Sequence, residues 1–170
     1  LENIKSSIIE AILLVLVIVF LFLRNVRATL IPIITIPISL IGSLIFLNLC
    51  GFSINIMTLL AMVLAIGLVV DDAIIMLENI TRHIENGETP LNAAMKGAKE
   101  IGFAIIAMTL TLTSVYAPIA FLTGVIGQLF IEFAAALAGS VLISGIVAIT
   151  LSPLMCAKIL KPKQATILPQ

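Results

Sequence analysis

Two adjacent aspartates, Asp71 and Asp72, are the residues of this sequence best placed to do chemistry, because they stand in the middle of a long apolar run. The residues from Ala65 to Leu77 include no other charged side chain. An ionised aspartate at the centre of a membrane helix costs about 2.5 to 3.5 kcal/mol, so such residues are normally protonated, paired or turned toward a wet interior. Carboxylates held in this way are typical of proton relays, and we identify this pair as a candidate proton-binding site.

The two carboxylates are expected to influence each other and to respond to a cation. Neighbouring helix positions point about 100° apart, so Asp71 and Asp72 do not stack, yet they remain close enough to repel each other when both are ionised. A lysine from another helix would favour the charged forms. Every lysine of this sequence lies near a predicted span boundary, so that lysine must come from another part of the protein. The alternative is a pair of buried carboxylates that only hydrogen-bond to neighbouring helices and fix their packing.

Other polar residues give weaker indications. Glu78 lies about one and a half turns closer to the inner end of the same run, where it can reach lipid headgroups, and we interpret it as an interfacial residue. Cys50 and Cys156 end predicted spans on opposite sides of the membrane, and with the single His83 they form no metal-binding motif. The sequence shows no catalytic constellation of an enzyme, so we expect a transporter without a cofactor.

The elements that must position the aspartates are membrane helices. Hydrophobic residues make up 61% of the 170 positions and charged residues 11%, with a mean hydropathy of +1.29, whereas a soluble domain carries about 25% charged residues. The net charge is zero, which gives no indication of nucleic-acid binding. A bilayer core of about 30 Å needs about 20 apolar residues in a helix. We predict an all-α, polytopic transmembrane helical bundle that forms a single domain over residues 1–170, with five spans at residues 8–23, 29–49, 56–77, 101–122 and 133–154.

Basic residues indicate the orientation of these spans. Eight of the nine lysines and arginines lie in the segments 24–27, 81–100 and 158–163, whereas the segments 50–55 and 123–132 contain none. The positive-inside rule then places the first three segments on the inner side, with Lys5 as the exception, and the first span runs from outside to inside.

The longest polar stretch contains a helix start, because Thr89 followed by Pro90 combines a hydroxyl N-cap with proline at the first helical position. Apolar residues then recur at helical spacing, which predicts an amphipathic helix at residues 90–100 on the inner surface. An ordinary connector is the alternative.

Small and hydroxyl-bearing residues indicate close helix packing. Small residues that let helices approach each other occur on the third and fifth spans: Ala61, Ala65, Ala134, Ala135, Ala138, Gly139, Ser144, Gly145 and Ala148. On the fourth span Thr109, Thr111, Thr113 and Ser114 either line a hydrated path or bond back to their own helix, and we favour the second. Kinks are expected at Pro32, Pro37 and Pro118.

The motif around the aspartates resembles a known family. Gly67-Leu68-Val69-Val70-Asp71-Asp72-Ala73, followed by Glu78-Asn79, is similar to the fourth transmembrane helix of resistance-nodulation-division (RND) efflux pumps. Residues 22–32, 51–55 and 151–157 resemble flanking segments of the same family, in the same order. The resemblance covers essentially the whole chain and equates the five predicted spans with helices two to six of a twelve-helix transporter.

This resemblance implies a proton/drug antiporter that exports hydrophobic or amphiphilic compounds. Members work as homotrimers in the inner membrane of Gram-negative bacteria, together with a periplasmic adaptor and an outer-membrane channel. Asp71 and Asp72 then correspond to the proton-relay carboxylates, whose partner lysine lies on a helix of the other half. In the heavy-metal branch the second aspartate is typically alanine, so Asp72 favours the drug and amphiphile branch.

Other interpretations stay open. The chain begins at Leu1 and lacks the family's first helix, its large periplasmic domains and its second half. We therefore expect either a segment of a full pump or an inactive or assembly-only remnant of a split gene. A heavy-metal-branch or protein-export relative of the same superfamily shares the helical architecture, but the Asp-Asp pair argues against it.

Overall fold

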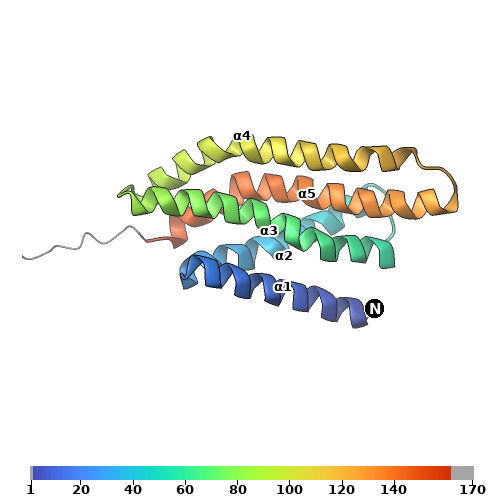
Figure 1. Cartoon of the computed structure of the whole chain (residues 1–170), viewed down its shortest axis with the longest axis horizontal. Coiled ribbons are helices and arrows are strands. Elements are labelled where there is room, and N and C mark those ends of the chain that lie inside the picture. Colours follow the sequence, from blue (N-terminus) through green and yellow to red (C-terminus); the bar gives the residue numbers. More distant parts are fainter. Residues whose placement is uncertain (1, 162–170) are drawn as a thin grey trace, which may run out of the picture.

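The computed structural model describes residues 2–161 as five long helices and one short 3-10 helix (Figure 1). The long helices are α1 (Glu2–Leu23), α2 (Val26–Leu49), α3 (Ile56–Glu85), α4 (Pro90–Tyr116) and α5 (Gly124–Ile159), and the 3-10 helix η1 (Ala117–Phe121) follows α4. All five long helices are long and apolar enough to span a membrane, and the described residues contain no strand. The predicted all-α transmembrane bundle is thus confirmed. Lys163, one of the basic residues used for the orientation, lies outside the described residues.

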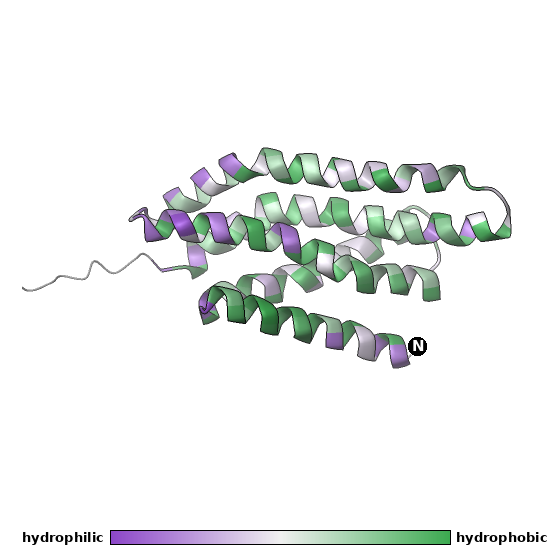
Figure 2. Cartoon of the chain, viewed as in Figure 1, coloured by the Kyte–Doolittle hydropathy of each residue, from purple (hydrophilic) through white to green (hydrophobic). Residues whose placement is uncertain are grey.

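Helix α5 occupies the centre of the bundle, where it packs against α2, α3 and α4, whereas α1 contacts only α2 and α3 (Figure 1). The connections α1–α2 and α3–α4 and the last turn of α5 lie at one end of the bundle. Strongly polar residues gather there (Figure 2). This is the end that the basic residues assign to the inner side. The chain therefore brings its three predicted inner segments together.

Most helix ends extend beyond the predicted spans, although α4 ends at Tyr116 and η1 covers the last part of the fourth span. Helix α3 continues past residue 77 to Glu85, and α5 begins at Gly124 instead of residue 133. Helix α4 begins at Pro90 as predicted, with the Thr89 hydroxyl accepting a hydrogen bond from the backbone N–H of Asn92. Residues 90–100 form the first turns of this one continuous helix, because no residue between them and the fourth span breaks it.

Caps and prolines set the ends of the other helices. The Asn25 side chain accepts hydrogen bonds from the backbone at the start of α2. Asn55 and Thr58 form a reciprocal capping box at the start of α3, which fixes the entry of the aspartate-bearing helix. Pro118 lies in η1, where α4 tightens into a 3-10 turn.

Small residues allow close helix packing, as predicted, and they let α5 lie in the middle of the bundle. A Cβ added to Gly139 would lie 2.5 Å from Cδ1 of Phe46 on α2, and one added to Gly145 would lie 2.6 Å from Oγ1 of Thr109 on α4. Ala61 and Ala65 on α3 are fully buried against the same part of the core. Helices that approach this closely leave no room for larger side chains.

Candidate proton-binding site

The aspartates lie halfway along α3, the 30-residue helix that starts at the Asn55 capping box. At 1.5 Å per residue such a helix is about 45 Å long, which exceeds the thickness of about 30 Å of a bilayer core. The fold thus places the two carboxyl groups far from either end of the bundle, and their depth in the membrane stays a prediction.

Asp72 faces the interior of the bundle and is only 5% exposed. Its Oδ2 atom lies 3.0 Å from the hydroxyl of Ser144 on α5, which donates a hydrogen bond to it. The same hydroxyl lies 3.3 Å from the backbone carbonyl of Val69. A serine has one hydrogen to donate, so it can serve only one of these two acceptors at a time.

Asp71 points about 100° away from Asp72 around the helix, and its side chain is exposed in this chain. Exposed residues recur along the same stripe of α3 at Leu60, Leu64, Gly67, Asp71 and Glu78. The first four are three or four positions apart and Glu78 follows two turns later, so all five lie on one face of α3. Within residues 2–161 no lysine or arginine forms an ion pair with either aspartate.

Near each of its ends, α3 is hydrogen-bonded to a carboxylate from another helix. At the outer end, the Asn55 side-chain amide donates to Glu132 of α5. At the inner end, Asn79 Nδ2 donates to Oε2 of Glu100 on α4 at 3.2 Å. These contacts join residues 77 and 21 positions apart, so no local sequence pattern announces them.

The inner end carries a further polar cluster that the sequence analysis does not identify. The His83 ring lies between two carboxylates, with Nδ1 at 3.2 Å from Glu88 and Nε2 at 2.9 Å from Glu100. Lys96 Nζ donates to Glu88 at 2.9 Å. The hydrogen bond from Lys96, with a smaller contribution from His83, lowers the pKa of Glu88. The cluster joins the end of α3, the connecting turn and the start of α4.

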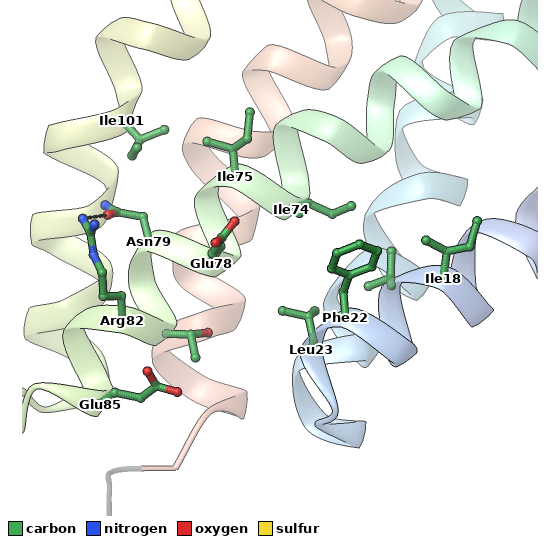
Figure 3. Close-up of a pocket in the computed structure, with 12 residues that line it drawn as sticks. Ile18, Phe22, Leu23, Ile74, Ile75, Glu78, Asn79, Arg82, Glu85 and Ile101 are labelled. Carbon is green, nitrogen blue, oxygen red and sulfur yellow. Dashed lines mark hydrogen bonds between the residues drawn. The ribbon is translucent and has the colours of Figure 1, made fainter.

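A cavity of about 750 Å³ opens between α1, α3 and α4 near the inner end (Figure 3). Ile18, Phe22 and other apolar side chains of α1 form one wall, and α3 forms the opposite wall with Ile74, Glu78, Arg82 and other residues. Arg82 Nη2 donates to Asn79 Oδ1 at 2.6 Å, the contact drawn in Figure 3. Glu78 thus borders a cavity with mixed walls, and its interfacial role stays a prediction.

The hydroxyl groups on α4 mostly bond back to their own helix, as favoured from the sequence. Thr111, Thr113 and Ser114 each donate to the backbone carbonyl four residues earlier, at 2.7–2.8 Å. Thr109 differs, because its buried hydroxyl has no hydrogen-bond partner among the described residues and packs directly against Gly145. Thr109 therefore contributes to the packing of α4 against α5, whereas Thr111 and Ser114 are exposed.

Known proteins show similarity over the whole chain. The model of the AcrB/AcrD/AcrF family matches residues 1–167. A protein named an uncharacterized transporter, from Haemophilus influenzae, is 57% identical over 160 residues, which are 94% of this chain and 16% of that protein. Multidrug resistance protein MdtC from Pantoea ananatis is 48% identical over 170 residues, all of this chain and 17% of that protein. The chain thus spans about a sixth of the length of the curated relatives it matches.

Proposed function

This chain belongs to the AcrB/AcrD/AcrF family of resistance-nodulation-division transporters, and we propose that it is the part of a proton-driven exporter in which Asp71 and Asp72 bind and release the driving protons. The exported compounds are hydrophobic or amphiphilic, in keeping with the multidrug resistance named for the MdtC relatives. The chain works as a secondary active transporter segment in the inner membrane of a Gram-negative bacterium.

The observation that carries this proposal is the position of Ser144 between Asp72 and the Val69 carbonyl. When Asp72 is ionised, the Ser144 hydroxyl donates to the carboxylate. When Asp72 is protonated, its O–H can donate to Ser144 Oγ while the serine turns its own hydrogen to Val69. Both protonation states are therefore satisfied by a hydrogen-bond rearrangement within the same pocket, which suits a group that gains and loses a proton in each cycle.

The free energy that one proton gains from the membrane potential is similar to the cost of an ionised aspartate in a membrane helix. One elementary charge moving across a membrane potential is worth about 2.3 kcal/mol per 100 mV. An ionised aspartate at the centre of a membrane helix costs about 2.5 to 3.5 kcal/mol. A single proton thus carries enough free energy to change whether Asp72 is better buried or better solvated, and a change of that size can shift how α3 packs.

The outward direction of Asp71 supports a partner from another part of the transporter. Its stripe on α3 is left uncovered by α1, α2, α4 and α5, so a helix of the other half can lie against it. We place the predicted lysine on that helix, where approach of its ammonium group stabilises the ionised carboxylates. The remaining partners follow the family: a twelve-helix subunit, a homotrimer, a periplasmic adaptor and an outer-membrane channel.

Asp71→Asn and Asp72→Asn, each placed in the complete transporter and reconstituted in vesicles, are expected to abolish drug export and the coupled proton flux. Asparagine has nearly the same shape as aspartate and keeps an acceptor for Ser144, so packing is retained while proton exchange is lost. Glu78→Gln on the same helix is the matched control and is expected to leave export near the wild-type rate. Expression and oligomeric assembly are measured for all three variants.

The outcomes separate the competing interpretations. Export that survives both aspartate changes contradicts the proton-relay role and favours carboxylates that only fix helix packing. Loss of assembly at unchanged export per assembled transporter favours an assembly-only role. Export that stops while assembly is intact supports the proposed relay.

A further inference from the structure

The inner-end cluster contains a histidine with an acceptor on each side of its ring. Nδ1 of His83 contacts Glu88 in the turn after α3, and Nε2 contacts Glu100 on α4. The His83 side chain is 14% exposed, whereas the side chains of Glu88 and Glu100 are 23% and 50% exposed. A neutral imidazole carries one N–H, whereas imidazolium carries two. While Glu88 and Glu100 are ionised, both contacts can be hydrogen bonds at the same time only when the ring is protonated.

The other charged groups of the cluster are already engaged, which leaves the two carboxylates as the groups that face the ring. Lys96 on α4 donates to Glu88, and Arg82 on α3 donates to Asn79. Within residues 2–161, His83 forms no ion pair with a basic or acidic group of α1, α2 or α5. The state of this contact therefore depends on whether His83 holds its second proton.

The same contact ties the aspartate-bearing helix to its neighbour. Glu100 accepts hydrogen bonds from both Asn79 and His83, which lie one turn apart on α3. His83 stands eleven positions after Asp72, or about 16 Å along one uninterrupted helix. Any shift of α3 that accompanies proton exchange at Asp72 must stretch this contact or move α4 with it.

We propose that protonated His83 is a latch that holds the inner ends of α3 and α4 together, and that loss of one ring proton on the inner side loosens it. The proposal rests on the function proposed above for its consequence, which is that the latch slows the movement of α3 when the inner side is acidic. Histidine suits such a device because its charge normally changes between about pH 5 and pH 8. The latch makes the rate of export depend on inner pH.

The first test measures the protonation of the His83 ring and does not depend on transport. Nitrogen NMR of the complete transporter labelled with ¹⁵N-histidine, with His83→Gln to assign the signal, is expected to show both ring nitrogens protonated at about pH 7, above the usual histidine pKa of about 6.5. Glu100→Gln, which removes one charged acceptor, is expected to lose the second proton at a lower pH than the wild type. A neutral His83 ring at about pH 7 in the wild type overturns the proposal.

The second test measures export in vesicles while the inner pH is raised at constant outer pH and potential. His83→Arg keeps its charge at every pH and has N–H groups for both carboxylates, so it is expected to match the wild type at acidic inner pH and to fall about two- to fivefold below it at alkaline inner pH. His83→Gln is expected to exceed the wild type by a similar factor at acidic inner pH. Lys99→Gln, an exposed position on α4, is the control and should follow the wild type throughout.

Ratios of variant to wild type that do not change with inner pH, or that change in the opposite sense, overturn the latch. The two proposals fail separately. Export that survives Asp71→Asn and Asp72→Asn contradicts the relay but leaves the NMR result for His83 unaffected. A neutral His83 contradicts the latch but leaves the effect of the aspartate variants intact.

Discussion

Gly145 on α5 gives the sharpest test of the packing beside the aspartates, because it adjoins Ser144 and faces Thr109 across the α4–α5 contact. In Gly145→Ala the new Cβ would lie 2.6 Å from Thr109 Oγ1 and 3.4 Å from Thr109 Cγ2, whereas ordinary contacts are at 3.4–4 Å. Threonine is β-branched, so rotation about χ1 brings one of these two atoms toward the new methyl group in most positions. Helices α4 and α5 must therefore move apart.

The expected cost follows from two opposing terms. Adding a methyl group to a closely packed core costs about 1 to 3 kcal/mol. Replacing glycine with alanine inside a helix gains up to about 1 kcal/mol from backbone propensity alone. Gly102→Ala on α4 supplies the second term without the first, because a Cβ there meets no atom within 4 Å. Gly145→Ala should thus be less stable than Gly102→Ala by about 1 to 3 kcal/mol.

The assay is equilibrium unfolding of the purified transporter in mixed detergent micelles, with helix content as the signal. The double variant Gly145→Ala/Thr109→Ala removes both crowded atoms and leaves the Thr109 Cβ position at 3.5 Å, an ordinary contact. It is expected to recover at least about 1 kcal/mol relative to the sum of the single variants. Equal stabilities of Gly145→Ala and Gly102→Ala, or double-variant effects that simply add, would refute the close α4–α5 approach.

Three further predictions concern the contacts around α3. Ser144→Ala removes the hydroxyl that serves ionised Asp72 and is expected to slow export about tenfold or more, whereas Ser152→Ala, a buried hydroxyl on the same helix without a partner among the described residues, should stay near the wild-type rate in the same transport assay. Asn55→Ala removes the α3 cap and the contact with Glu132 and should lower unfolding stability by about 0.5 to 2 kcal/mol, with Asn55→Ser recovering most of it because serine also caps. The hydrogen bond from Lys96 lowers the pKa of Glu88, so this contact stabilises the α3–α4 connection at pH values above the ordinary carboxyl pKa of 4.5 and is lost as the pH falls below that value. Hydrogen exchange of the backbone amides in that turn should therefore become faster in acid. Lys96→Gln should remove most of this acid dependence.

The helical architecture could be predicted from the sequence because membrane insertion imposes a simple rule on length and polarity. Each apolar run long enough to cross the bilayer became a helix, and Thr89-Pro90 marked the start of α4 correctly. The ends were less accurate, since hydropathy reports where lipid contact stops and not where the helix stops. Helix α3 continues into the polar region as far as Glu85, and residues 90–100 join α4 without a break.

The aspartates could be identified from the sequence because a charged side chain inside a membrane helix is energetically costly. Their hydrogen-bond partners could not be identified in this way. Ser144 is predicted only as a small packing residue, and its bond to Asp72 depends on how α3 and α5 are rotated against each other. Glu100 and His83 are ordinary polar residues of an inner connection until the turn at Gly87 folds α4 back on α3. Long-range pairs of this kind carry no local periodicity, so sequence patterns do not reveal them.

Taken together, the contacts of α3 restrict the kind of movement that protonation can produce. The helix is fastened to α5 at its outer end through Asn55 and Glu132, and to α4 at its inner end through Glu100. A slide of α3 along its axis, or a rotation of the whole helix, would strain both contacts, whereas a local twist of the middle turns changes mainly the surroundings of the aspartates. Because Asp71 and Asp72 point about 100° apart, such a local twist exchanges burial between the two carboxyl groups. In the proposed relay, the adjacent pair is therefore better suited than a single aspartate to couple proton binding to a local twist of α3 within the bundle.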